Sequence, residues 1–187
     1  MSALGSARRR PGSRGGSRTA GRGVQVLAPE RASDPEAARE AALKLLERTR
    51  RTRSDLVRRL RDRGFAAPTI EAVVERLRAV GLVDDVEYAR AFLSGRWGRR
   101  SAGWRKLEQD LFRRGISAED AAAGKALVER QTGVADEVAV ARRTLEQVER
   151  RYAALDPRVR RQRLYALLIR RGFGRETIDE VLREGGR

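Results

Sequence analysis

Apolar residues recur with helical spacing from Glu36 to the end of the chain, and one ten-residue pattern occurs three times. The copies read LVRRLRDRGF (56–65), LEQDLFRRGI (107–116) and LYALLIRRGF (164–173). Each has the form Leu-x3-Leu-x2-Arg-Gly-apolar. The spacing of its leucines is that of one helix face, and the glycine is a typical helix stop. Each copy therefore predicts a helix that ends at the glycine.

A further helix is expected on either side of each copy. Helical periodicity over about 36–50, 85–97 and 135–154 predicts the helix that precedes each one. Internal repetition of this length is typical of stacked repeat proteins. The expected fold is all-α, an elongated and curved body of three tandem three-helix repeats. These repeats are assigned to residues 36–83, 84–133 and 134–187.

The helix after each glycine is predicted from apolar residues at fixed distances. Six residues beyond the glycine the chain has Ile70, Ala121 and Ile178. Nine residues beyond it, the outer copies have Val73 and Val181, whereas the middle copy has Gly124. This spacing places apolar groups on one face of a helix, with a gap in the middle repeat.

The three glycines are predicted to adopt a left-handed conformation, as in a Schellman cap, with the leucine four residues earlier contacting the apolar residue that follows. Arg63, Arg114 and Arg171 then stand at the negative ends of helix dipoles, where a cation contributes roughly 0.3–1 kcal/mol. We therefore interpret these arginines as parts of helix ends rather than as ligand contacts.

The net charge of the chain indicates which class of partner to expect. Lys and Arg number 42 against 26 Asp and Glu, a formal charge of +16. Residues 1–35 are rich in Gly, Ser, Arg and Ala without apolar periodicity, and they are predicted to form a disordered tail. Seven arginines against two acids give this tail +5 and leave +11 on the body. Such an excess favours polyanions, nucleic acid above all.

Several function classes are disfavoured by what the sequence lacks. It contains no Cys and no His, which removes thiol nucleophiles, imidazole bases and their metal-ligand chemistry. No catalytic residue, metal site or cofactor is assigned. There is no apolar run of about 20 residues and no apolar core of a secretory signal at the N-terminus. A cytoplasmic protein that does not contact membranes is expected.

Two basic clusters are candidate binding surfaces for a protein partner or nucleic acid. The first comprises Arg96, Arg99, Arg100, Arg105 and Lys106, and the second comprises Arg158, Arg160, Arg161 and Arg163. The first cluster spans a turn that contains Gly and Ser, where helix periodicity does not require charged residues. The alternative to a binding surface is that this turn is a solvated loop. Contacts from such clusters to phosphates give affinity without reading base sequence.

Acidic and aromatic residues between the first two copies receive structural interpretations. Asp84 and Asp85 stand at the predicted start of a helix and complement its positive end. Trp104 falls on the apolar stripe of the next helix, so it is expected to extend the core. For Trp97 two interpretations remain, a core position and an exposed contact.

The stretch from 81 to 116 resembles the RecX family. The resemblance rests on Gly81-Leu82-Val83-Asp84-Asp85, Tyr88-Ala89, Phe92, an Arg-rich turn with Gly103, Lys106-Leu107, Leu111 and Arg114-Gly115-Ile116. It extends over about residues 38–185, less closely in the third repeat, and it excludes the tail. Tandem three-helix repeats, the architecture of that family, agree with the repetition described above.

The resemblance implies a non-enzymatic regulator, usually an inhibitor, of the RecA recombinase in recombination, DNA repair and the SOS response. The implied partners are the RecA filament and single-stranded DNA, with duplex DNA as a further candidate, and a monomer is expected. A helix-turn-helix transcriptional or architectural protein remains the alternative. A helical scaffold whose charge serves solubility alone is a third possibility.

Overall fold

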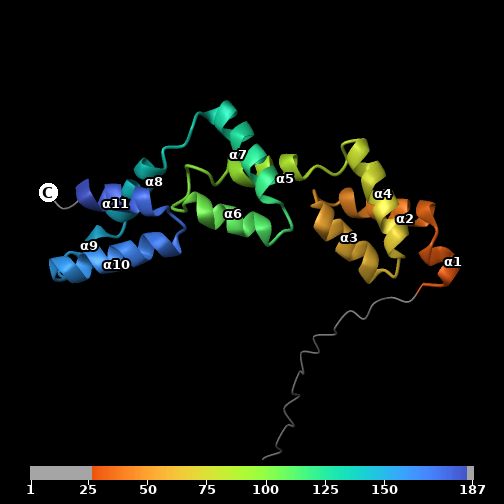
Figure 1. The fold of residues 1–187 in the computed structure, drawn as a ribbon, viewed down its shortest axis with the longest axis horizontal. Coiled ribbons are helices and arrows are strands. Elements are labelled where there is room, and N and C mark those ends of the chain that lie inside the picture. Colours follow the sequence, from red (N-terminus) through yellow and green to blue (C-terminus); the bar gives the residue numbers. More distant parts are fainter. Residues whose placement is uncertain (1–26, 185–187) are drawn as a thin grey trace, which may run out of the picture.

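The computed structural model describes residues 27–184. Within that range the secondary structure consists of helices joined by loops, without strands (Figure 1). Repeat 1 comprises α2 (Pro35–Leu46), α3 (Arg53–Asp62) and α4 (Ala67–Ala79). Repeat 2 comprises α5 (Asp85–Ser94), α6 (Trp104–Phe112) and α7 (Ala118–Thr132). Repeat 3 comprises α8 (Glu137–Glu146), the short α9 (Glu149–Tyr152), α10 (Pro157–Arg170) and α11 (Arg175–Glu184). The predicted all-α fold of three three-helix repeats is confirmed.

Each repeat has a hydrophobic core of its own. Leu56 and Leu60 of α3 are fully buried against α2 and α4. Leu111 of α6 and Leu168 of α10 occupy the equivalent buried positions in the separate cores of repeats 2 and 3. The leucines of the recurring pattern are therefore the centres of three small cores, and the repeats follow one another along the long axis of the molecule (Figure 1).

The predicted glycine caps are confirmed. Gly64, Gly115 and Gly172 have φ of 88°, 80° and 82°, in the left-handed region. In each repeat the residue after the glycine donates its N–H to the carbonyl of the second leucine, as from Phe65 to Leu60 at 3.3 Å. This is the six-residue bond of the Schellman motif.

Gly124 explains the gap in the apolar pattern of repeat 2. A Cβ at this position would lie 2.7 Å from the Ala89 Cβ and 2.8 Å from the Arg90 backbone nitrogen, both on α5. The glycine therefore allows α7 to pack closely against α5, where valine occupies the equivalent position in the other repeats. A small residue here serves helix packing as directly as a large one does elsewhere.

Helical structure is present within the stretch that the sequence assigned to the tail. Pro29–Ala32 form a helical turn, α1, and the Ala32 carbonyl accepts from the Ala66 N–H at 2.9 Å. Leu27 packs against the core of repeat 1. The predicted disordered tail was thus drawn too long at its C-terminal end, because it missed these contacts with the first repeat. Its residues 1–26 lie outside the described range.

The two tryptophans of repeat 2 form a packed group rather than an exposed platform. Trp97 is buried, and its Nε1 donates to Glu129 Oε1 at 2.9 Å. The Trp97 and Trp104 rings meet edge to face with centroids 5.7 Å apart. The Lys125 ammonium lies 4.8 Å and 5.0 Å from the two ring centroids. Trp97 is therefore a core residue, which settles the alternative that the sequence left open.

The first junction, between repeats 1 and 2, joins the start of α3 to the end of α6. The Thr52 hydroxyl donates to the Arg114 carbonyl at 2.8 Å and accepts from the Asp55 N–H at 3.1 Å. The Arg53 N–H donates to Asp85 Oδ1 at 2.9 Å. Asp85 therefore caps the helix of the preceding repeat, while Asp84 caps α5 as predicted.

The second junction, between repeats 2 and 3, repeats this scheme at the start of α6 and the end of α10. The Gly103 N–H donates to the Arg171 carbonyl at 2.9 Å, and the Arg105 N–H donates to the Gly172 carbonyl at 3.2 Å. The Trp104 N–H donates to Glu137 Oε1 at 2.8 Å. Glu137 thus takes the role that Asp85 has at the first junction.

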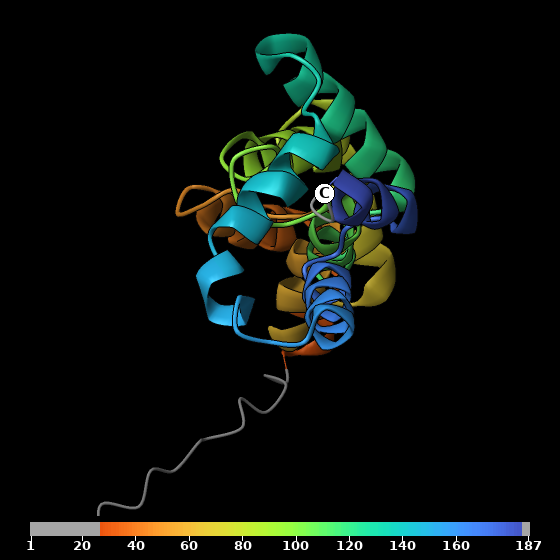
Figure 2. The same cartoon turned by 90° about the vertical axis from the view of Figure 1, so that its left-hand side faces the viewer.

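These contacts place α10, α6 and α3 end to end. In a view along the long axis of the molecule, the three helices overlap (Figure 2). The C-terminal end of each helix meets the N-terminal end of the next, an arrangement in which opposite ends of helix dipoles are neighbours. The central helices thereby form a column that carries one groove at each junction.

Candidate nucleic-acid interface

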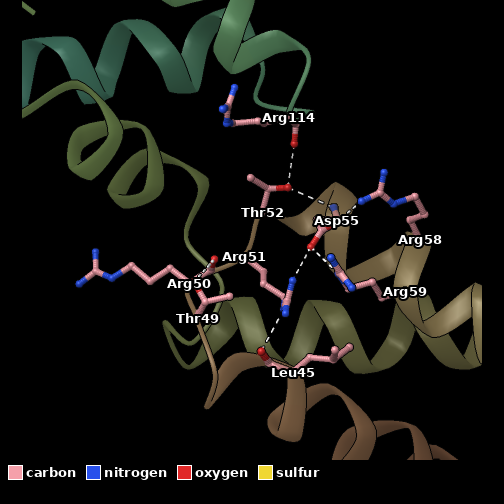
Figure 3. Close-up of polar contacts among 9 residues, drawn as sticks. All are labelled: Leu45, Thr49, Arg50, Arg51, Thr52, Asp55, Arg58, Arg59 and Arg114. Atoms are coloured by element: carbon pink, nitrogen blue, oxygen red, sulfur yellow. Dashed lines mark hydrogen bonds and ion pairs between the residues drawn. The ribbon is translucent and has the colours of Figure 1, made fainter. Parts of the chain in front are cut away.

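A basic groove lies at the first junction, where the start of α3 faces the end of α6 (Figure 3). Its volume is about 370 Å³. Five arginines and one acid, Asp55, contribute to its lining. The arginines are Arg50, Arg51, Arg58, Arg113 and Arg114, and Thr49, Thr52, Ser54 and Tyr88 complete the lining. We call this the first-junction groove.

Asp55 organises one side of the first-junction groove. Its carboxylate accepts from Arg51 Nη1 at 2.9 Å, from Arg59 Nε at 2.8 Å and from Arg58 (Figure 3). Partial burial raises the pKa of Asp55, but the hydrogen bonds from the three arginines outweigh it and hold the pKa below its usual range. Three guanidinium groups on one carboxylate leave an excess of positive charge.

The arginines of the first-junction groove differ in what they can offer a ligand. Arg51 is mostly buried and also donates from Nε to the Leu45 carbonyl at 2.9 Å, so it holds the end of α2 (Figure 3). The side chains of Arg50, Arg58 and Arg113 are largely exposed. Each has an acidic partner but retains solvent-facing N–H groups, because a guanidinium carries five donors. These three arginines are the ones accessible to phosphates.

Arg50 and Arg90 create a second charge cluster beside the groove. Arg50 Nη1 donates to Glu87 Oε1 at 2.7 Å, and Arg90 Nε donates to Glu87 Oε2 at 2.6 Å. The hydrogen bonds from Arg90 and then Arg50 lower the pKa of Glu87 to about 2. The Arg50 contact also ties the loop before α3 to α5, so this ion pair spans the first junction.

The first predicted cluster divides into exposed and engaged side chains. Arg99, Arg100 and Arg105 are exposed and form no ion pair or side-chain hydrogen bond with another described residue. Arg96 donates to the Phe92 carbonyl at 2.6 Å and lies over the Phe92 ring. Lys106 pairs with Asp110 at 3.3 Å. Three of the five cations thus remain open to a partner.

The second predicted cluster lies at the first turns of α10, away from the first. Arg161 donates to the Leu182 carbonyl at 2.9 Å, near the end of α11. Arg158 and Arg163 are exposed, and Arg160 is half-buried. The end of α10 that meets Gly103 is the opposite one, so the length of this 14-residue helix, roughly 20 Å, separates the start of α10 from the second junction. The structure does not bring the two clusters together.

The sequence did not single out the first-junction groove. Arg50 and Arg58 belong to repeat 1 and Arg113 belongs to repeat 2, so only the stacking of the two repeats brings Arg113 to the other two arginines. The recurrence of the Arg-Gly step was visible in the sequence. Its interpretation as a helix end gave no indication that the end of one central helix faces the start of the central helix in the previous repeat. A repeat-by-repeat alignment of exposed positions could have provided that signal.

The fold and its exposed cations define a class of protein, a helical repeat protein with an arginine-rich groove. Within residues 27–184 no helix is long and apolar enough to cross a bilayer. The exposed guanidinium groups are suited to phosphate oxygens, which they bind with charge-assisted hydrogen bonds. Binding of this kind needs neither a metal nor a cofactor.

Comparison with known proteins identifies the family. Models of the first, second and third RecX three-helix domains match residues 38–77, 84–124 and 135–182. The chain therefore belongs to the RecX family of regulatory proteins. It is 37% identical over 153 residues to the regulatory protein RecX of Mycobacterium leprae (strain Br4923), which covers 79% of this chain and 84% of the relative.

Further relatives agree with this assignment. The regulatory protein RecX of Thermobifida fusca (strain YX) is 37% identical over 150 residues, covering 79% of this chain and 77% of the relative. The crystal structure of RecX from Lactobacillus salivarius matches with a TM-score of 0.70 at 22% identity, covering 82% of this chain and 97% of the other. At that identity the structural match supports the fold.

Proposed function

We propose that this protein regulates the RecA recombinase by binding the RecA–DNA filament, and that it inhibits filament assembly, ATP hydrolysis and strand exchange. Membership of a family of regulatory proteins supports a regulatory role. The observation that carries the filament assignment is the first-junction groove, which is lined by arginines of two repeats. The protein acts in the cytoplasm, as a monomer and without catalysis.

Phosphate contacts supply much of the affinity in this proposal. Arg50, Arg58 and Arg113 neutralise backbone phosphates, and the release of condensed counterions favours binding without reference to base sequence. Single-stranded DNA within the filament is the principal nucleic acid, and duplex DNA is a weaker ligand. The exposed clusters at Arg99–Arg105 and Arg158–Arg163 extend the positive surface along the same body.

Inhibition follows from occupancy rather than from chemistry. A helical column that holds both DNA phosphates and RecA subunits opposes the subunit rearrangements that assembly and strand exchange require. A ligand shifts such an equilibrium by its differential affinity for the two states. The regulator therefore needs to bind one filament state more tightly, and it needs no nucleophile, general base or metal.

The proposal is tested by comparing three ligands in parallel titrations at two salt concentrations. They are bare single-stranded DNA, RecA-coated single-stranded DNA, and a pool of duplexes of random sequence. We expect tighter binding to the coated strand and inhibition of its ATP hydrolysis at the same protein concentrations. Selection of one duplex sequence from the pool, without preference for the coated strand, would contradict the proposal.

A further inference from the structure

The second junction also carries a groove, but with a different lining. Its volume is about 600 Å³, and it lies between α6, the start of α7 and the end of α10. Four large apolar side chains contribute to it: Phe112, Ile116, Ile169 and Phe173. We call this the second-junction groove.

Two of these apolar side chains are exposed without a packing partner that would explain them. Phe112 is 71% exposed and Ile169 is 41% exposed, whereas Ile116 and Phe173 of the same groove are buried in the cores of repeats 2 and 3. They are equivalent by repeat, since each follows the second leucine of the recurring pattern, where repeat 1 has Arg61. Exposed apolar groups gathered in a groove mark a binding surface more often than isolated ones do.

The rim of the second-junction groove is positively charged. Arg105, Lys106 and Arg170 contribute to its lining, and Glu108 is the acid among the lining residues. Arg105 and Arg170 are exposed and form no ion pair with another described residue. The groove therefore combines an apolar floor with two arginines that pair with no acid among residues 27–184, which is complementary to a segment with apolar anchors and carboxylates.

The charge of the chain argues against its own segments as occupants. Residues 1–26 contain six arginines and no acid, so they would be repelled by the rim. A second copy carries the same formal charge of +16. Bare nucleic acid would satisfy the cations, but its phosphates would gain nothing from Phe112 and Ile169, and desolvating them against apolar groups is costly.

We infer that the second-junction groove is a docking site for an acidic protein segment that inserts two apolar side chains beside Phe112 and Ile169. This inference rests on the proposed function, because the segment is supplied by RecA subunits of the filament. The two grooves then divide the contacts: DNA phosphates at the first junction and protein at the second. Apolar anchors of this type commonly dominate the affinity of an interface.

The test compares Phe112→Ala/Ile169→Ala with a control, Val80→Ala/Val134→Ala. Val80 and Val134 are 68% and 81% exposed and lie outside the groove, so the control also removes two exposed apolar side chains. Both proteins are titrated against RecA-coated and bare single-stranded DNA, and circular dichroism melts verify that each is folded. We expect the groove variant to bind the coated strand about tenfold more weakly or worse, since truncating such anchors commonly has effects of this size. Its affinity for bare DNA and the behaviour of the control should be unchanged.

Each other result has a distinct meaning. If the parent prefers the coated strand and the folded groove variant binds it equally well, the docking site is wrong while the proposed function stands. If the variant loses affinity for bare DNA to the same degree, the groove is a nucleic-acid surface and the inference is overturned. A change in sedimentation between parent and variant would instead assign the groove to a second copy of the chain and overturn the inference. If the parent shows no preference for the coated strand, both the docking site and the proposed function fall.

Discussion

The two junctions share a backbone scheme but present different surfaces. At each junction, the C-terminal end of one central helix meets the N-terminal end of the central helix in the previous repeat. A carboxylate of the later repeat accepts an N–H from the first turn of that earlier central helix. The side chains around the contact nevertheless diverge. Arg58 lines the first groove where Gln109 lines the second, and the second has Phe112 and Ile169 on its walls.

This difference indicates that the contacts that hold the repeats together are distinct from the side chains that line the grooves. Stacking depends on close approach and on hydrogen bonds to main-chain groups, donated by the Thr52 hydroxyl at the first junction and by main-chain N–H groups at the second. Arg58, Phe112 and Ile169 are exposed and are therefore able to vary without disturbing the stack. One repeated element can thus present an arginine-lined surface at one junction and an apolar surface at the next.

The largest effect is expected from a side chain added where the second junction is tightest. A Cβ on Gly172 would lie 2.3 Å from the Lys106 backbone nitrogen, and one on Gly103 would lie 2.4 Å from the Gly172 carbonyl oxygen. Gly172→Ala should reduce the free energy of unfolding by about 2–5 kcal/mol, because it combines overpacking with a left-handed conformation. Gly103→Ala, which has φ of −76°, should show the overpacking alone, about 1–3 kcal/mol.

Gly81→Ala is the control for this measurement. Gly81 has φ of 73° and ends α4 with the same pattern of hydrogen bonds as Gly172 at the end of α10, but a Cβ there would meet nothing within 4 Å. Its cost should be limited to the conformational part, about 1–2 kcal/mol. Urea unfolding of the three variants supplies the comparison. Equal losses for Gly172→Ala and Gly81→Ala would show that the close approach of α10 to α6 does not exist.

At the first junction the corresponding test is Thr52→Val. The Thr52 hydroxyl is buried, caps α3 and donates to the Arg114 carbonyl. Its removal should cost about 1–3 kcal/mol, because it deletes an N-cap and leaves a carbonyl without its donor. Thr52→Ser retains the hydroxyl and should lose much less. Chemical denaturation in which Val and Ser behave alike would assign the role of Thr52 to packing.

A smaller effect is expected from pH. Glu87 has an ordinary pKa of 4.5 and a folded-state pKa of about 2, so its ion pairs stabilise the fold above pH 4.5 and are lost as the pH falls towards 2. Asp55 acts in the same direction, whereas burial raises the pKa of Asp85, which partly offsets them. Glu87→Gln should therefore flatten the fall in stability of the parent over this window. Denaturant midpoints at several pH values provide the test, and an unchanged slope would contradict it.

The smallest effect on stability, within about 1 kcal/mol, is expected from Arg99→Glu/Arg100→Glu/Arg105→Glu, because exposed charges contribute little to folding. Binding to the RecA filament should nevertheless weaken, and inhibition should be relieved. Titrations at two salt concentrations with circular dichroism of the variant check both statements. A folded variant that binds and inhibits like the parent would identify the turn as a solvated loop, and Arg158–Arg163 would be tested next.

The sequence predicted the repeats because their cause is local. The leucine spacing and the glycine after Arg63, Arg114 and Arg171 determine helix faces and helix ends within ten residues. The grooves depend on how repeats stack, which places Arg58 beside Arg113 although 55 positions separate them in the chain. In the sequence, Gly124 was only a gap in the apolar pattern. The reason for a glycine there is the close approach of a neighbouring helix, α5. The burial of Trp97 likewise required its partner on α7, Glu129.

The account is tested most directly by measuring the salt dependence of binding for Arg58→Gln/Arg113→Gln. Its control, Arg39→Gln/Arg78→Gln, removes two exposed arginines that also pair with an acid three residues earlier but lie outside the groove. The groove variant should bind bare and RecA-coated single-stranded DNA more weakly, with a slope of log K against log salt reduced by roughly 0.7 for each lost phosphate contact. The control should retain the slope of the parent, and Phe112→Ala/Ile169→Ala should lose affinity for the coated strand alone. Equal slopes for the groove variant and its control would contradict the assignment of DNA to the first junction.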